Sequence, residues 1–155
     1  MSDSPAPAEA LSRLSTDALA LHRALRAGGK GRARTLALWI TDAQDLARSA
    51  LEALLDLTQA RPYTTADELL FLDRLAQIAK AAQGAGAELT AALARAVENQ
   101  RRCAGAASGR VVVLGPSPQQ LIASAADLLG RIPALCHAIH RDRLVPPIHH
   151  ANQPC

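Results

Sequence analysis

Aromatic residues are scarce in this chain, in which only Trp39, Tyr63 and Phe71 among 155 residues carry an aromatic ring. Residues that favour β-strands are also few, and they gather in one short run at positions 111–114. Alanine and leucine supply most of the apolar side chains, and both are strong helix formers. The composition therefore argues against a strand-rich fold and predicts an all-α protein. A chain of this length suffices for one domain with its own core.

Long apolar runs and paired cysteines are missing as well. No stretch reaches the roughly 18 uninterrupted apolar residues that a membrane span requires, and the first eleven residues lack the basic and then apolar order of a signal peptide. The three cysteines are widely scattered and form no disulfide framework. The net charge of +3 is too small to indicate a nucleic acid or a membrane as partner. We expect a cytoplasmic protein that binds no membrane and no cofactor, and the Ala- and Arg-rich composition is typical of GC-rich bacterial genomes.

The most regular pattern lies between residues 65 and 102, where small or apolar residues recur in alternating steps of three and four. Such a heptad pattern keeps one stripe of a helix facing a partner helix. Gly84 and Gly86 interrupt this stretch at about 1 kcal/mol each relative to alanine. We therefore expect a continuous helix whose neighbour approaches closely there, with a kink or break as the alternative. The residues of this heptad seam are Leu72, Leu75, Ala79, Ala82, Gly86, Leu89, Leu93 and Ala96.

Three other segments have the periodicity of amphipathic helices, at about 8–27, 32–60 and 117–145. The helix ends carry recognisable signals: Gly28 after the first, a capping box of Thr65 and Glu68 before the long heptad stretch, and a second one of Ser117 and Gln120. The expected buried stripe of the first helix is Leu11, Leu14, Ala18, Leu21 and Leu25, and that of the last helix is Leu121, Ala125, Leu128, Ile132, Leu135 and Ile139.

The short connection near Arg61-Pro62 predicts that the second and third helices are antiparallel neighbours. We therefore predict a four-helix, bundle-like domain over residues 8–145, built on this long hairpin. A short extended segment is expected at 110–114, with a disordered N-terminus at 1–7 and a flexible tail at 146–155.

Helix–helix association is the function that these stripes favour. The interpretation is a non-enzymatic interaction, regulatory or accessory protein that forms a homodimer or binds a helical partner. Whether the heptad seam closes within one chain or between two is left open by the sequence. The expected contact residues are Trp39, Leu72, Leu75, Ala79, Ala82, Gly86, Leu89 and Leu93.

A basic end of the predicted hairpin offers a second interpretation, a nucleic-acid accessory protein that binds phosphates. An antiparallel hairpin brings the start of its first helix beside the end of its second, and basic residues lie at both places. Aromatic residues for base stacking are not interleaved among them, which weighs against this interpretation. The candidate anion-binding residues are Arg23, Arg26, Lys30, Arg32, Arg34, Arg95, Arg101 and Arg102, with Arg110 close by.

Cysteine and histidine residues gather near the C-terminus, where a metal site is a weaker candidate. Cys136 and His140 are four residues apart, on one face of a helix, and His149 and His150 follow in the tail. Paired-ligand spacings such as CxxC or HExxH are missing, so the sequence predicts no metal. His22 is expected to be a surface or packing residue. The buried stripes contain no carboxylate, histidine or tyrosine, which argues against an enzyme.

Overall fold

The computed structural model describes residues 7–28, 32–60, 65–105, 109 and 115–144, and nearly all of these residues are helical. The helices are α1 (Pro7–Ala27), α2 (Ala33–Ala60), α3 (Ala66–Gly105) and α4 (Pro118–Leu144). No residue in the described ranges forms a strand, so the predicted all-α fold is confirmed. Three predicted segments, the extended one at 110–114, the tail at 146–155 and most of the N-terminus at 1–7, lie outside the described residues.

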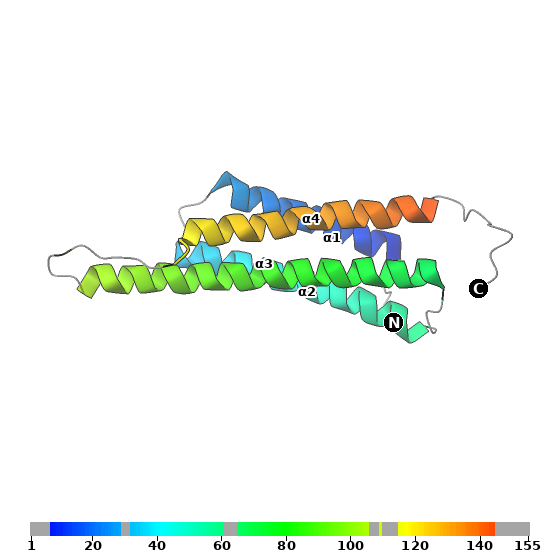
Figure 1. Ribbon diagram of the computed structural model, residues 1–155, viewed down its shortest axis with the longest axis horizontal. Helices are drawn as coiled ribbons and strands as arrows, with labels where there is room; N and C mark the ends of the chain where they lie inside the picture. The colour runs from blue at the N-terminus through cyan, green and yellow to red at the C-terminus, as the bar shows by residue number, and fades with distance from the viewer. Residues whose placement is uncertain (1–6, 29–31, 61–64, 106–108, 110–114, 145–155) are drawn as a thin grey trace.

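The four helices form an antiparallel bundle in which each helix packs against two others. α1 contacts α2 and α4, and α3 contacts the same two helices. Figure 1 shows α2 and α3 side by side as a hairpin, with α1 and α4 above them. At 40 residues α3 is the longest helix, about 60 Å at 1.5 Å per residue. Its C-terminal end projects beyond the other helices (Figure 1).

An apolar core follows the axis of this bundle. All five residues of the predicted stripe on α1 are buried. Among the described residues, no polar or charged side chain is buried. The core therefore rests on aliphatic packing, without internal hydrogen bonds between side chains. Its largest fully buried side chains are Leu36, Leu75, Ile78, Leu89, Leu129, Ile132 and Ile139.

The predicted helix caps are present. Thr65 Oγ1 accepts a hydrogen bond from the amide of Glu68 at 3.3 Å, and the Glu68 carboxylate accepts one from the amide of Thr65 at 3.3 Å. Ser117 and Gln120 form the equivalent pair at the start of α4. Gly28 has a φ of 66°, the left-handed conformation that ends α1 with least strain in a glycine. These caps satisfy backbone groups that the helix itself leaves unpaired.

The helix α3 continues through its two central glycines, as predicted. A Cβ atom added at Gly84 would lie 3.1 Å from Cδ1 of Leu128 on α4, whereas one at Gly86 would lie 3.8 Å from Cβ of Ala43 on α2. Gly84 therefore faces α4 and Gly86 faces α2. The contact at Gly84 is too tight for an unadjusted methyl group, and the contact at Gly86 is an ordinary one.

Candidate association surface

The heptad seam faces the interior of the bundle. Leu75 and Leu89 are fully buried, Gly86 approaches α2, and Leu72 and Leu93 are half-buried at the two ends. Trp39, the expected large anchor, is 9% exposed and belongs to the same core. The seam is therefore covered by helices of its own chain. A contact with another molecule has to use a different surface.

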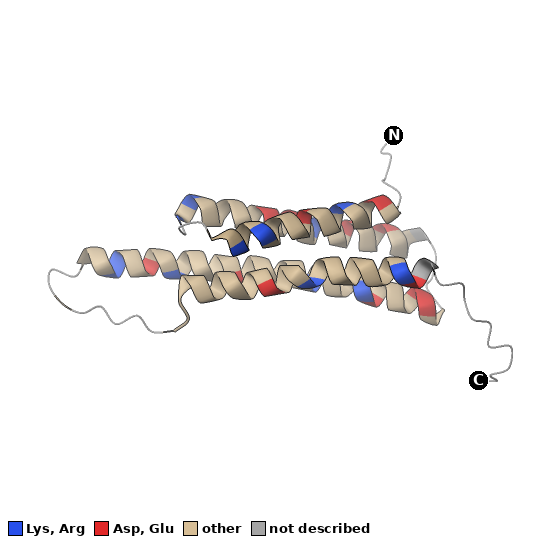
Figure 2. Cartoon of the chain, turned by 90° about the horizontal axis from the view of Figure 1, so that it is seen from above, with Lys and Arg blue, Asp and Glu red and all other residues tan. Residues whose placement is uncertain are grey.

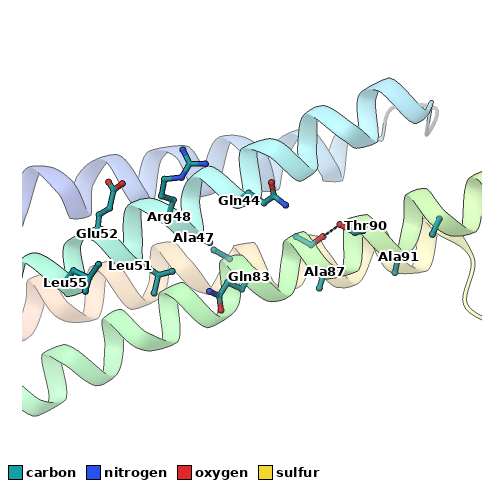
Figure 3. A pocket seen from close by; sticks show the side chains of 13 residues that line it. Gln44, Ala47, Arg48, Leu51, Glu52, Leu55, Gln83, Ala87, Thr90 and Ala91 are labelled. Carbon is teal, nitrogen blue, oxygen red and sulfur yellow. Dashed lines mark hydrogen bonds between the residues drawn. The ribbon is translucent and has the colours of Figure 1, made fainter.

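An apolar groove of about 900 Å³ runs along the outer side of α2 and α3. Figure 3 shows Ala47 and Leu51 on the side of α2 that faces α3, with Arg48 and Glu52 farther from α3. Small residues of α3 form the opposite side, including Ala87, Ala91 and Ala94. The groove exists because these alanines leave space that larger side chains would fill.

Large aliphatic side chains on this side of the hairpin remain in contact with water. Leu51 is 39% exposed and Leu55 56% on α2, and Leu69 is 53% exposed and Val97 43% on α3. Along α3, Leu69 lies before and Val97 after the groove-lining residues, which run from Ala82 to Ala94. Large exposed apolar patches are uncommon on monomeric proteins and typical of binding sites, which directs attention to this side of the hairpin.

A second heptad stripe accounts for the α3 side of this surface. Positions seven residues apart carry Leu69, Ala76, Gln83, Thr90 and Val97, and all five are exposed. Thr90 Oγ1 donates a hydrogen bond of 2.8 Å to the carbonyl oxygen of Gly86, so its methyl group is the part left for contact (Figure 3). We call the exposed surface formed by this stripe and its neighbours the hairpin face. It consists of Gln44, Leu51 and Leu55 on α2 and of Leu69, Ala76, Gln83, Ala87, Thr90, Ala94 and Val97 on α3. Exposed charged side chains border it: Arg48 and Glu52 of α2, which also line the groove, and Lys80 of α3, one heptad before Ala87.

The sequence did not reveal the hairpin face, because alanine, glutamine and threonine at its centre resemble ordinary solvent-facing residues. The signal that was available is the seven-residue spacing from Leu69 to Val97. A second signal is the presence of Leu51 and Leu55 on the otherwise polar side of α2. Only the packing of α2 beside α3 shows that the two sets of residues share one surface.

The basic end of the bundle carries acids as well as arginines. Figure 2 shows basic segments where α1 ends, α2 begins and α3 ends. Arg26 pairs with Asp127 of α4 at 2.5 Å, and Glu98 pairs with both Arg101 and Arg102. The hydrogen bond from Arg102 holds the pKa of Glu98 below its ordinary value. Of the other candidate anion-binding residues, Arg23, Arg32 and Arg34 are exposed and Arg95 is half-buried, and Lys30 and Arg110 lie outside the described residues.

The predicted metal candidates do not form a site in the described part of the chain. Cys136 is buried in the core, and burial raises the pKa of its thiol to about 11. A metal ligand has to be a thiolate, which this environment disfavours. His140 is exposed on α4, and His149 and His150 lie outside the described residues. No group of three metal-ligating side chains occurs among the residues that the structure describes.

A smaller groove of about 440 Å³ lies between α1 and α2, beside Trp39. Three carboxylates line it: Asp17 from α1, and Asp42 and Asp45 from α2. Burial raises the pKa of Asp42, and the charges of Asp45 and Asp17 raise it further. Arg48 lies 3.6 Å from Asp45 and offsets part of this repulsion. The carboxylates therefore repel one another in a groove with an aromatic wall.

His22 is a packing residue between α1 and α4. Its Nδ1 lies 2.7 Å from the carbonyl oxygen of Ala126, and Gly130 leaves room for the ring. Because a carbonyl oxygen only accepts, Nδ1 carries the hydrogen of this bond. His22 therefore joins two helices and lines neither of the two grooves.

Comparisons of the chain with protein families, curated proteins and solved structures find no match. By length and composition alone, Pro118–Asp142 of α4 would suffice to cross a membrane, with a mean hydropathy of 1.2. In the bundle this segment packs against α1 and α3 and contributes Leu129 and Ile132 to the core.

Proposed function

We propose that this protein is a non-enzymatic association module that pairs with a second copy of itself through the hairpin face. The observation that carries the proposal is the exposure of Leu51, Leu55, Leu69 and Val97 along one side of the bundle. Helices with small residues between such leucines pack closely against other helices. This pairing is the function that we propose for the protein.

The size of the hairpin face fits a stable dimer. From Leu69 to Val97 the face spans 28 residues, or about 42 Å at 1.5 Å per residue. Two helices side by side, each about 10 Å wide, give roughly 800 Å² per copy, the area that one partner contributes to a standard protein–protein interface. The face therefore needs no additional element to form an interface of ordinary size.

The character of the larger groove supports association rather than catalysis. The larger groove is lined mainly by alanine and leucine, and its polar groups do not converge on one point. No polar side chain that lines the larger groove is buried, whereas catalytic groups are commonly desolvated to tune their pKa. An apolar, open and elongated surface is what a second helix pair would cover.

A matched pair of substitutions tests the proposal. Leu55 lies in the hairpin face and Leu38 lies outside it on the same helix, and their exposures are nearly equal at 56% and 57%. About half of the roughly 2 kcal/mol available from burying a leucine remains to be gained at Leu55, so its loss costs about 1 kcal/mol per copy and 2 kcal/mol per dimer. Leu55→Glu should raise the dimer Kd by about 30-fold or more.

The control variant Leu38→Glu should leave the dimer Kd within about twofold of the wild-type value, because Leu38 is not part of the interface. Multi-angle light scattering over a range of protein concentrations gives both constants. Circular dichroism verifies that the two variants keep the helical content of the wild type. Equal effects of the two substitutions, or a wild-type protein that is monomeric at every concentration, would exclude the proposed function.

A further inference from the structure

The hairpin face also indicates how two copies are oriented. We infer that they pack antiparallel, with α3 of one copy along α3 of the other and Gln83 on the two-fold axis. This inference rests on the proposed function, because it takes the hairpin face as the contact surface. It adds the orientation, the register and the residue that fixes the register.

The stripe on α3 is symmetric in residue size about Gln83. Two positions precede Gln83 and two follow it, each seven residues apart. An antiparallel two-fold axis through Gln83 places Leu69 of one copy opposite Val97 of the other, and Ala76 opposite Thr90. In a two-fold interface every such contact occurs twice. Large side chains then meet large ones near the two ends, and small ones meet near the centre.

The charges on α3 favour the antiparallel orientation over the parallel one. Residues 67–73 contain three acids and no base, whereas residues 95–102 contain three arginines and one acid. The antiparallel arrangement brings Arg101 of one copy to the first turn of α3 in the other, which carries Asp67 and Glu68. A parallel arrangement would place the arginine cluster of one copy beside the same cluster of the other. Juxtaposed charges of one sign are unfavourable, and opposite charges select the partner and the orientation.

The length of α3 agrees with this register. Its C-terminal end, with Arg101 and Arg102, projects beyond the other helices of its own copy (Figure 1). With Gln83 on the axis, position 101 lies level with position 65 of the other copy, just before α3 begins at Ala66. The projecting end of each α3 therefore lies alongside the first turn of the other and does not extend into water.

Gln83 acts as the residue that fixes the register. Its side-chain amide has both donors and an acceptor, so two copies facing each other across the axis satisfy one another. A shift by one heptad would place Gln83 opposite alanine or threonine and leave the amide without its match. A single polar residue in an apolar helix interface specifies register in the same way in coiled coils.

Disulfide crosslinking tests orientation and register together. In a Cys103→Ser, Cys155→Ser background, Gln83→Cys should form a covalent dimer when an oxidant is added, because the new thiol of one copy faces the equivalent thiol of the other. The matched variant Ala76→Cys, one heptad away on the same exposed stripe, should remain uncrosslinked. Its two thiols would lie about 20 Å apart along the antiparallel helices. Crosslinking of both variants would show a parallel dimer and overturn the inference.

Spin labels on the natural Cys103 give a second, independent measurement with the full chain. Cys103 is exposed and Cys136 is buried, so Cys155→Ser leaves one reactive site in the described residues. Cys103 lies 20 residues beyond Gln83, which predicts a separation of about 60 Å between labels in the antiparallel dimer.

The outcomes separate the two proposals. A dimer with its Cys103 labels within about 20 Å, the spacing of neighbouring helices plus the label arms, refutes the antiparallel orientation and leaves the hairpin face as the interface. Crosslinking at Ala76 but not at Gln83 refutes the register. A monomer by light scattering refutes the proposed function and this inference with it. A label distance near 60 Å together with selective crosslinking at Gln83 supports both.

Discussion

The two central glycines of α3 differ in how much space surrounds them, and that difference predicts that the same substitution stabilises the protein at one of them and is neutral at the other. Gly86→Ala replaces the poorer helix former by the best one, a gain of about 0.8–1.0 kcal/mol. The new methyl group would meet Ala43 Cβ at 3.8 Å, an ordinary contact. The free energy of unfolding should therefore rise by about 1 kcal/mol and Tm by about 3 °C for a chain of this size.

Gly84→Ala has the same gain in helix propensity, but its methyl group would lie 3.1 Å from Leu128 Cδ1. The end of the leucine side chain has to move by a few tenths of an ångström, and overpacking of this kind costs about 1 kcal/mol or more. The two terms cancel, so the stability of Gly84→Ala should be close to that of the wild type.

Urea unfolding monitored by circular dichroism measures both variants. The measurement is made at two protein concentrations, since dimerisation adds to the apparent stability by mass action. A Gly86→Ala variant that is less stable than the wild type by 1 kcal/mol would refute the reasoning. It would mean that α2 lies too close to α3 at Ala43 for a methyl group.

Three further predictions concern side chains of the core and of the α1–α4 contact. Burial raises the pKa of Cys136 to about 11. In the folded protein, iodoacetamide at pH 8 should therefore modify the exposed Cys103 and spare Cys136. Equal rates of modification of the two cysteines, measured by mass spectrometry, would contradict the burial of Cys136. The same raised pKa makes the free energy of unfolding depend on pH. The contribution of Cys136 is fully present below pH 9 and is lost as the pH rises from 9 to 11, because in that range the thiol ionises only in the unfolded protein. His22→Ala removes the bond to the Ala126 carbonyl and part of the α1–α4 packing, and should lower the free energy of unfolding by about 1–2 kcal/mol. An unchanged urea midpoint would show that His22 contributes nothing to the contact.

The parts of the fold that the sequence predicted depend on local signals. The stripe of α1, the caps at Thr65 and Ser117 and the continuous α3 follow from spacing and from residue types within a few positions. Such signals need no knowledge of which helix lies opposite. The all-α class and the hairpin of α2 and α3 follow from the same local information.

The prediction was incomplete where one helix packs against two neighbours. The expected stripe of α4 included Leu128, which is half-buried against Gly84, and omitted Leu129, which is fully buried. On α3, Ile78 and Ala85 are buried although they lie outside the heptad seam. A helix with two neighbours buries a wider arc than one stripe, and spacing within a single helix does not reveal the second neighbour.

The candidate site shows the same division between local and tertiary information. The heptad seam was identified correctly as a helix-packing stripe, but its partner helices belong to the same chain. The pairing of Arg26 with Asp127 joins residues 101 positions apart, which no local pattern indicates. The hairpin face appears only when Leu55 of α2 and Ala87 of α3 are seen to border one groove.

The measurement that tests the central claim most directly is the solution mass of the unmodified protein by light scattering, across protein concentration and salt. The chain has a mass of 16.3 kDa. We predict a species of twice that mass that persists in high salt, because alanine, leucine and valine supply most of the contact and salt screens only the charged side chains around them, such as Arg48 and Glu52 at the groove. A mass of one chain at every concentration would contradict the account.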